Sequence, residues 1–190
     1  MKIGVLALQG AFEEHCQMLQ RLGVDSILIR NLDDFNKFLS LKGDGGTGLI
    51  LPGGESTAMM RVMKDEGLYE PIRKAIREGL PVMGTCAGMI LLDDKHLDCM
   101  DITVKRNAYG RQLGSFQTEY DVKGVGNVPM VFIRAPYIER YGNGVEVLST
   151  LDGHVVAARQ QNMLVCSFHP ELTEDTRIHQ YWLSIINVKH

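Results

Sequence analysis

The first half of the chain alternates short apolar runs with segments in which apolar residues recur every three or four positions. Residues 2–8 form a continuous apolar run, as a strand buried on both faces does. From Phe12, apolar residues recur at helical spacing up to Gly23. The same alternation continues as strand, helix, strand, two helices and strand, at residues 26–30, 33–41, 49–51, 56–66, 69–78 and 81–83. Alternating strands and helices are typical of parallel βαβ units, so we expect an α/β fold with a doubly wound, mostly parallel sheet.

The second half of the chain has a different pattern. Between residues 102 and 166 it reads as short strands separated by glycine turns, and we expect these strands at 116–122, 130–134, 145–149, 155–159 and 163–167. Helical periodicity returns at 173–186. The pattern predicts an antiparallel extension of the sheet and a closing helix. Repeats, low-complexity stretches and linkers are lacking, so we expect residues 1–190 to form a single domain.

Composition excludes several classes of protein. The chain has 190 residues, 45% of them hydrophobic, and a net charge of -3 with no long basic run, which argues against nucleic acid as a partner. No apolar run reaches the roughly 18 residues of a membrane helix, and the N-terminus does not resemble a signal segment. The cysteines show neither paired nor metal-like spacing, so we expect a reducing cytoplasm and no metal. They are Cys16, Cys86, Cys99 and Cys166.

One cysteine lies where the apolar run 81–83 meets an apolar helical segment. Gly84 and Gly88 flank it in the order Gly-Thr-Cys-Ala-Gly. Because these glycines carry no Cβ, the backbone can turn sharply and expose Cys86 above the sheet edge, as in a Gly-x-Ser-x-Gly nucleophile elbow. The start of a helix there favours the thiolate. An isolated cysteine is more often a packing residue, as we expect of the other three, but this setting predicts a nucleophile.

A histidine and a glutamate follow the last predicted strand. His169 stands where the strand ends, and Glu171 comes two residues later. Open α/β sheets bind ligands at the carboxyl ends of their strands, so His169 is the best candidate base for Cys86, with Glu171 orienting its ring. An isolated histidine is commonly structural, and the other histidines are less well placed for catalysis. They are His15, His96, His154, His179 and His190.

A second glycine turn closes the strand at 49–51, in the order Pro-Gly-Gly-Glu-Ser. Its simplest interpretation is a tight turn into a helix capped by Ser56 or Thr57. Beside a cysteine nucleophile, the turn has a second interpretation. The backbone N–H of Gly54, together with that of Ala87, would then hold an oxyanion.

The cysteine turn and the Phe-His-Pro-Glu segment resemble the class I, triad-type glutamine amidotransferases. Within that group the chain is similar to one family, the glutaminase subunits of pyridoxal 5'-phosphate synthase. The matching segments run in order across nearly the whole chain, at 7–11, 51–57, 86–92, 106–107, 110–112, 132–136 and 167–173. Met89 and Ile90 follow the elbow, where other branches usually carry a glutamine. The stretch 92–100 looks shorter than in the family.

The resemblance implies a class I glutamine amidotransferase fold, which is flavodoxin-like, and a role for each matching residue. Cys86 attacks the side-chain amide of L-glutamine, His169 serves as acid and base, and Glu171 orients His169. The residues that the resemblance places around the glutamine are Gly54, Glu55, Ser56, Arg106, Ile133 and Arg134. The planar fork of an arginine suits the α-carboxylate of the substrate. Without the resemblance, Arg106 and Arg134 would be read as solvated surface charges. No cofactor is implied.

The resemblance also implies a partner and leaves alternatives open. Ammonia would pass to a separate synthase (lyase) subunit, in a large hetero-oligomer that builds pyridoxal 5'-phosphate from a pentose phosphate and a triose phosphate. One alternative is the glutaminase subunit of another amidotransferase, such as imidazole glycerol phosphate synthase. Another is a non-catalytic protein of similar fold that uses Cys86 as an oxidation sensor. A sensor has no need of the His169–Glu171 pair, which therefore favours an enzyme.

Overall fold

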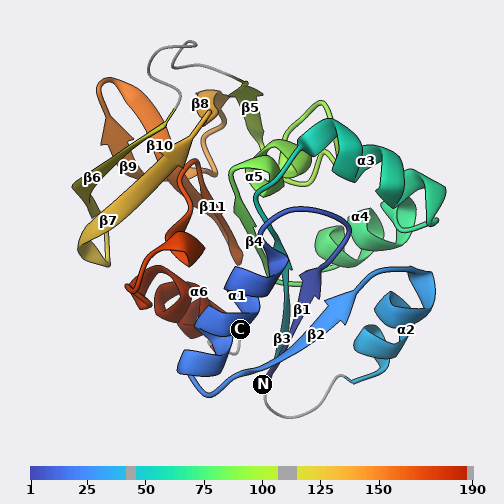
Figure 1. Ribbon diagram of the computed structural model, residues 1–190. Coiled ribbons are helices and arrows are strands. Elements are labelled where there is room, and N and C mark those ends of the chain that lie inside the picture. Colours follow the sequence, from blue (N-terminus) through green and yellow to red (C-terminus); the bar gives the residue numbers. More distant parts are fainter. Residues whose placement is uncertain (42–45, 107–114, 188–190) are drawn as a thin grey trace.

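The computed structural model describes residues 1–41, 46–106 and 115–187. Helices are α1 (Phe12–Arg21), α2 (Leu32–Ser40), α3 (Ser56–Asp65), α4 (Tyr69–Arg77), α5 (Ala87–Leu92), α6 (Arg177–Asn187) and the 3-10 helix η1 (Pro170–Leu172). Strands are β1 (Lys2–Leu6), β2 (Asp25–Ile29), β3 (Thr47–Leu51), β4 (Val82–Thr85), β5 (Ile102–Lys105), β6 (Ser115–Val122), β7 (Gly126–Ile133), β8 (Tyr137–Tyr141), β9 (Glu146–Leu151), β10 (His154–Gln160) and β11 (Met163–Cys166). Figure 1 shows the sheet with helices on both sides.

The described residues form one nine-stranded sheet and a separate two-stranded hairpin, β6–β7. The parallel part of the large sheet has the order β2-β1-β3-β4-β11, and β10, β8, β5 and β9 extend it in antiparallel fashion. An order of 2-1-3-4-5 in a parallel sheet is the flavodoxin-like doubly wound arrangement. The predicted α/β fold with an antiparallel extension is therefore confirmed.

Neighbouring residues of the central strands point to opposite faces of the sheet. Ile3 and Val5 of β1 join the hydrophobic cluster that packs on α1, α6 and the β6–β7 hairpin, whereas Leu6 joins the cluster that packs on α2, α3, α4 and α5. In β3, Leu49 and Leu51 join the same cluster as Leu6, and Ile50 joins the cluster of Ile3 and Val5. Both faces are thus covered, which explains why these strands read as unbroken apolar runs.

Several predicted boundaries were wrong, and two strands were missed. The structure ends β1 at Leu6, where the chain turns toward Gly10. Helix α6 begins at Arg177 rather than at residue 173, because Thr173 Oγ1 and Asp175 Oδ1 accept backbone N–H groups in the turn that precedes it. Strand β7 starts earlier than predicted, and β5 and β8 were not predicted. Part of the connection between the predicted helix 33–41 and the predicted strand 49–51, and the matching segments at Asn107 and 110–112, lie outside the described residues.

The stretch that looks shortened in sequence, 92–100, is closed by hydrogen bonds from α4. Arg73 Nε donates to the carbonyl of Leu97 at 2.9 Å, and Arg77 Nη2 donates to that of Asp98 at 2.7 Å. The Tyr69 hydroxyl donates to the carbonyl of His96 at 2.8 Å. These bonds fix the segment that follows α5.

None of the helices in the described part of the chain has the length and apolar character needed to span a bilayer.

Candidate active site

Cys86 stands at the turn between β4 and α5, as the sequence predicts. Its backbone adopts φ 48° and ψ −102°, in a region that L residues rarely occupy, and its N–H donates to the carbonyl of Cys166 at 2.8 Å. Its carbonyl accepts from the N–H groups of Met89 and Ile90, so Cys86 caps the helix while its backbone is held to β11. The residue is only 7% exposed, so the prediction that the turn exposes Cys86 above the sheet edge was wrong, although Cys86 lines the cavity at the site.

The glycines around Cys86 are required by close packing of α5 on the sheet. A Cβ at Gly88 would overlap the carbonyl oxygen of Leu51 in β3. A Cβ at Gly84 would lie 2.7 Å from the backbone of Gly88. Any larger residue at either position would push the helix away from β3 and β4, and Cys86 would move with it.

His169 and Glu171 form a buried pair beside this turn. His169 follows β11 and is held by a hydrogen bond from its N–H to the carbonyl of Val131 in β7. Its Nδ1 lies 2.7 Å from Glu171 Oε1. Burial opposes a charge on the ring, but hydrogen bonds to Cys86 and Glu171, with their charges, raise the pKa of His169 to about 10. Burial also opposes ionisation of Glu171, yet His15 and His169 keep its pKa below the ordinary value.

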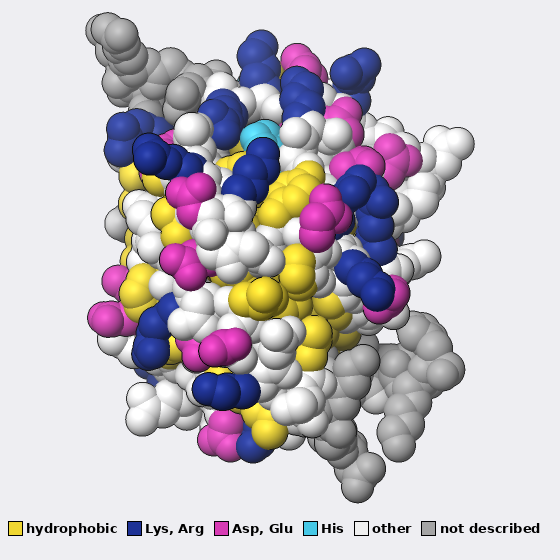
Figure 2. Space-filling model, turned by 90° about the vertical axis from the view of Figure 1, so that its right-hand side faces the viewer, with side chains coloured by type: hydrophobic (Ala, Val, Ile, Leu, Met, Phe, Trp, Pro, Cys, Tyr) yellow, Lys and Arg dark blue, Asp and Glu magenta, His cyan; other side chains and the backbone are white. Residues whose placement is uncertain are grey.

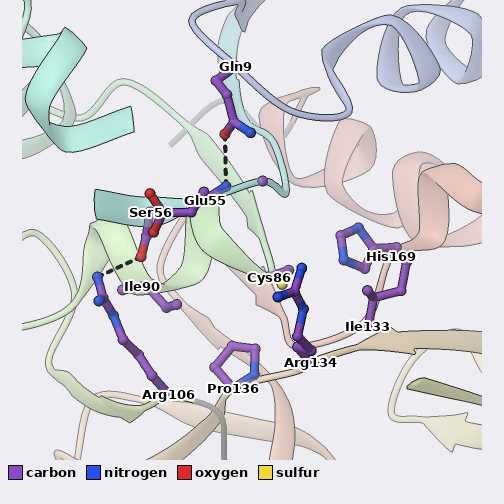
Figure 3. Close-up of a pocket in the computed structure, with 11 residues that line it drawn as sticks. Gln9, Glu55, Ser56, Cys86, Ile90, Arg106, Ile133, Arg134, Pro136 and His169 are labelled. Carbon is purple, nitrogen blue, oxygen red and sulfur yellow. Dashed lines mark hydrogen bonds between the residues drawn. The ribbon is translucent and has the colours of Figure 1, made fainter. Parts of the chain in front are cut away.

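Two glycine turns pack against each other and against the His169 ring. A Cβ at Gly53 would overlap that ring, and a Cβ at Gly10, where φ is +92°, would overlap the Gly53 carbonyl. This carbonyl accepts from the N–H of Ala11 at 2.9 Å. Gln9 Oε1 accepts from the N–H of Glu55 at 2.8 Å, the dashed line at the top of Figure 3. The ends of β1 and β3 are thereby joined at the site.

Helix α3 begins with a cap that the sequence interpretation assigned wrongly. The cap is Glu55, whose carboxylate accepts from the N–H groups of Thr57 and Ala58, and not Ser56 or Thr57. The Ser56 and Thr57 hydroxyls are left to accept from the guanidinium of Arg106, at 2.6 and 3.2 Å. Arg106 is therefore tied to the start of α3 and is not a free surface charge.

One cavity of about 420 Å³ brings most of the predicted site residues together (Figure 3). This volume lies in the range of small-molecule sites. The predicted residues that line it are Gly54, Glu55, Ser56, Cys86, Arg106, Ile133, Arg134 and His169, and Gln9, Ile90 and Pro136 complete the lining. Glu171 is not among the lining residues but lies buried, bonded to His169. Ala87, also absent from the lining, supplies the first residue of α5.

The other cysteines differ from Cys86. Cys166 is fully buried in β11, and burial raises its thiol pKa, as does the charge of Glu171. Burial likewise raises the pKa of Cys99 to about 11. In the ranges 1–41, 46–106 and 115–187, no three or more His, Cys, Asp or Glu side chains are grouped so as to hold a metal ion.

Sequence reasoning missed one histidine beside the His169–Glu171 pair. His15 of α1 is completely buried, and its Nε2 lies 3.6 Å from Glu171 Oε2. The signal was present in the pattern, because His15 occupies the apolar stripe of its helix, between Phe12 and Leu19. A polar residue in a buried stripe needs polar partners. Here they are Thr85 in β4 and, near the end of the chain, Glu171 and His179.

Comparison with known proteins identifies the class first. A solved structure described as "Crystal structure of glutamine amidotransferase" matches with a TM-score of 0.87 and 42% identity, over 98% of this chain and 99% of that one. A second, "Structure of PurLQS from Thermotoga maritima", matches with a TM-score of 0.64 at 17% identity over 96% of this chain, which supports the fold alone.

The family follows from sequence. Residues 5–188 match the SNO glutamine amidotransferase family, and the chain belongs to that family. Curated relatives include "Pyridoxal 5'-phosphate synthase subunit PdxT" of Streptococcus pneumoniae (strain ATCC 700669 / Spain 23F-1), 56% identical over the full length of both chains. The protein of that name from strain D39 / NCTC 7466 (serotype 2) is 55% identical, again over both full lengths. The family resemblance read from the motifs is confirmed.

Proposed function

We propose that the chain is the glutaminase subunit of a pyridoxal 5'-phosphate synthase. It hydrolyses L-glutamine to L-glutamate and ammonia and supplies the ammonia for vitamin B6 synthesis. The observation that carries the proposal is the convergence of Cys86 and the bonded His169–Glu171 pair at one cavity. Membership of the SNO family and the names of full-length relatives support the same reaction and pathway.

In the first half of the reaction, Cys86 is the nucleophile. Because His169 Nδ1 is bonded to Glu171 Oε1, Nε2 is the ring nitrogen left to exchange a proton with the cysteine sulfur. The thiolate adds to the side-chain amide carbon of glutamine. N–H groups of Gly54 and Ala87 are our candidates for holding the oxyanion. His169 Nε2 then protonates the amide nitrogen, the C–N bond breaks, and ammonia leaves a thioester on Cys86.

The second half releases glutamate. His169 Nε2 takes a proton from water, and the resulting hydroxide attacks the thioester carbon. The C–S bond breaks, and the sulfur recovers its proton from the ring. Throughout both halves Glu171 keeps the ring in one tautomer and stabilises its charged form.

We propose that the polar lining of the cavity orients glutamine. Arg106 and Arg134 are the candidates for its α-carboxylate, since a guanidinium can donate to both carboxylate oxygens. Glu55, Ser56 and the backbone at Ile133 complete the substrate site. Arg106 already donates to two hydroxyls, so its fork is oriented before substrate arrives. The expected effect of R106A is a raised KM with a smaller change in kcat.

We further propose that the chain works as a single domain in the cytoplasm, docked to a synthase (lyase) subunit in a large hetero-oligomer. Nucleic acid and membrane are not expected partners. The distribution of charge on one face of the molecule supports the expectation that nucleic acid is not a partner. Figure 2 shows positive and negative side chains interspersed there, with hydrophobic side chains between them, over the side that α2, α3 and α4 occupy in Figure 1.

The test measures glutamate production from L-glutamine by the purified full chain, alone and mixed with the synthase subunit of its own organism. We expect glutamate release in the mixture, its loss in C86A, and its retention in C99A, which removes a cysteine remote from the cavity. Release that survived in C86A would contradict the proposal. Stimulation by an imidazole glycerol phosphate synthase partner instead would assign the chain to that pathway, and oxidation of Cys86 without any glutaminase would make it a sensor.

A further inference from the structure

A buried polar cluster lies behind the His169–Glu171 pair, outside the substrate cavity. It joins four elements, with His15 from α1, Thr85 from β4, Glu171 from η1 and His179 from α6. Thr85, His15 and His179 are completely buried, and Glu171 is 5% exposed. His15 is the centre, because its Nδ1 lies 2.9 Å from His179 Nε2 and its Nε2 lies 3.0 Å from Thr85 Oγ1.

The unused oxygen of Glu171 determines which nitrogen of His15 carries the proton. Glu171 Oε1 contacts His169, whereas Oε2 is buried and accepts no hydrogen bond from any described residue. His15 Nε2 lies 3.6 Å from this oxygen. A lone pair on Nε2 would repel the carboxylate, so Nε2 bears the hydrogen and directs it at Thr85 Oγ1 and Oε2 together. Nδ1 then accepts from the Nε2–H of His179.

The His15 ring acts as a neutral donor and not as a cation. Burial lowers its pKa below 6.5, and the charge of Glu171 offsets this only in part. The pKa of His179 is also lowered well below its usual value by burial and by His15. Two neutral rings can form a chain of N–H donors, in which His179 donates to His15 and His15 donates toward the Glu171 carboxylate. This chain places no second positive charge beside His169.

We propose that His15 is a positioning residue, whose Nε2–H holds Glu171 Oε2 so that Oε1 stays aimed at His169. This inference rests on the proposed glutaminase function. The 3.6 Å separation is longer than an ordinary hydrogen bond. We expect it to shorten when glutamine is bound, as hydrogen bonds at such sites tighten in the reacting complex.

Two amide substitutions at position 15 separate the proposed role from simple packing. In H15Q the amide nitrogen reaches about the place of imidazole Nε2, so a donor to Glu171 remains. In H15N the shorter amide reaches only the place of Nδ1, so it can serve His179 but not Glu171. With the synthase subunit present, we expect H15Q to keep kcat within about threefold of wild type. H15N should lose about 10- to 100-fold in kcat, the effect of one hydrogen bond to a charged group, with KM for glutamine nearly unchanged.

The double variant with E171A tests whether His15 acts through Glu171. H15N should cost little further activity in the E171A background, because the group it positions is gone. An equal fold-loss of kcat in both backgrounds, or equal activity of H15N and H15Q, would overturn the proposal. Melting temperatures of H15N and H15Q identify a variant that merely fails to fold. Absence of glutaminase in the wild-type mixture would instead contradict the proposed function itself.

Discussion

At the scale of single residues, Cys86, the proposed nucleophile, occupies a strained backbone conformation. Cys86 has a positive φ although it carries a side chain, and its N–H and carbonyl are both fixed by neighbouring strands and helix. Positions of this kind cost about 1–3 kcal/mol and persist only where the surroundings over-determine them. Holding Cys86 in this conformation, beside the cavity that it lines, therefore lowers the stability of the folded chain.

Replacing Cys86 by glycine or by alanine isolates this cost. Both variants lose the sulfur and should be inactive, but only glycine accepts this φ without strain. We expect the free energy of unfolding of C86G to exceed that of C86A by about 1 kcal/mol. This figure allows for the greater freedom of glycine in the unfolded chain. Urea unfolding of the two variants measures the difference. Equal stabilities would show that the turn is not strained.

The pKa of His169 leads to a prediction about pH. Its folded-state value of about 10 lies above the ordinary 6.5, so the charged ring stabilises the fold. That contribution is complete below pH 6.5 and is lost as pH rises toward 10. In C86A the ring lacks the hydrogen bond and charge of Cys86, so its pKa should fall. Imidazole NMR titration would measure the shift, and the loss of stability between pH 6.5 and 10 should be smaller in C86A than in wild type.

At the scale of elements, the packing of α5 on the sheet decides where Cys86, the proposed nucleophile, lies. G88A should lower the unfolding free energy by roughly 2–3 kcal/mol, because a backbone carbonyl cannot move aside for the new Cβ. The melting temperature should then fall by about 5–10 °C. Glutaminase activity should fall as well, since the displaced helix carries Cys86 at its first turn.

A matched glycine provides the control for this prediction. A Cβ at Gly144 would meet nothing closer than 3.9 Å, so G144A should change stability by no more than about 0.5 kcal/mol. Calorimetry of both variants is sufficient. If G88A and G144A had the same melting temperature, the close contact between Gly88 and Leu51 would not hold α5 in place.

Sequence patterns predicted the buried parallel strands better than the exposed antiparallel ones. Strands β1, β3, β4 and β11 are covered on both faces and read as apolar runs. In β8, three of five residues are exposed and only Ile138 is buried, so no clear alternation marked it. In β7, Pro129 lies inside the strand, just before the predicted start at residue 130. Among the described residues this strand pairs with β6 alone, and a proline is tolerated in such a strand.

The candidate site was predictable where its residues follow strands, and not where they pack behind them. The positions of Cys86 and His169 follow from the rule that ligands bind at the carboxyl ends of parallel strands. The meeting of His15 with Glu171 depends on how α1 lies against η1, which local patterns do not encode. Long-range packing also decides the cap of α3. Arg106, distant in sequence, binds the hydroxyls of Ser56 and Thr57, and Glu55 caps the helix instead.

At the scale of the whole molecule, one sheet separates two hydrophobic clusters that share its strands. If the shared strands separate, both clusters become exposed to water. We therefore expect a single cooperative unfolding transition. Trp182, the one tryptophan of the chain, is completely buried in α6 and reports on one cluster. Its fluorescence and the far-ultraviolet circular dichroism should give coincident urea curves. Two separated curves would contradict the single-domain proposal.

The proposed active site, with the groups that support it, is assembled from both ends of the polymer. Gln9 and His15 come from its opening residues, Cys86 from its middle, and His169 and Glu171 from its final stretch. A partly synthesised chain thus holds a cysteine without its base, and one that lacks its last strand has no triad. On the proposed mechanism, hydrolysis of glutamine needs all three residues, so it can begin only once synthesis of the chain has passed Glu171.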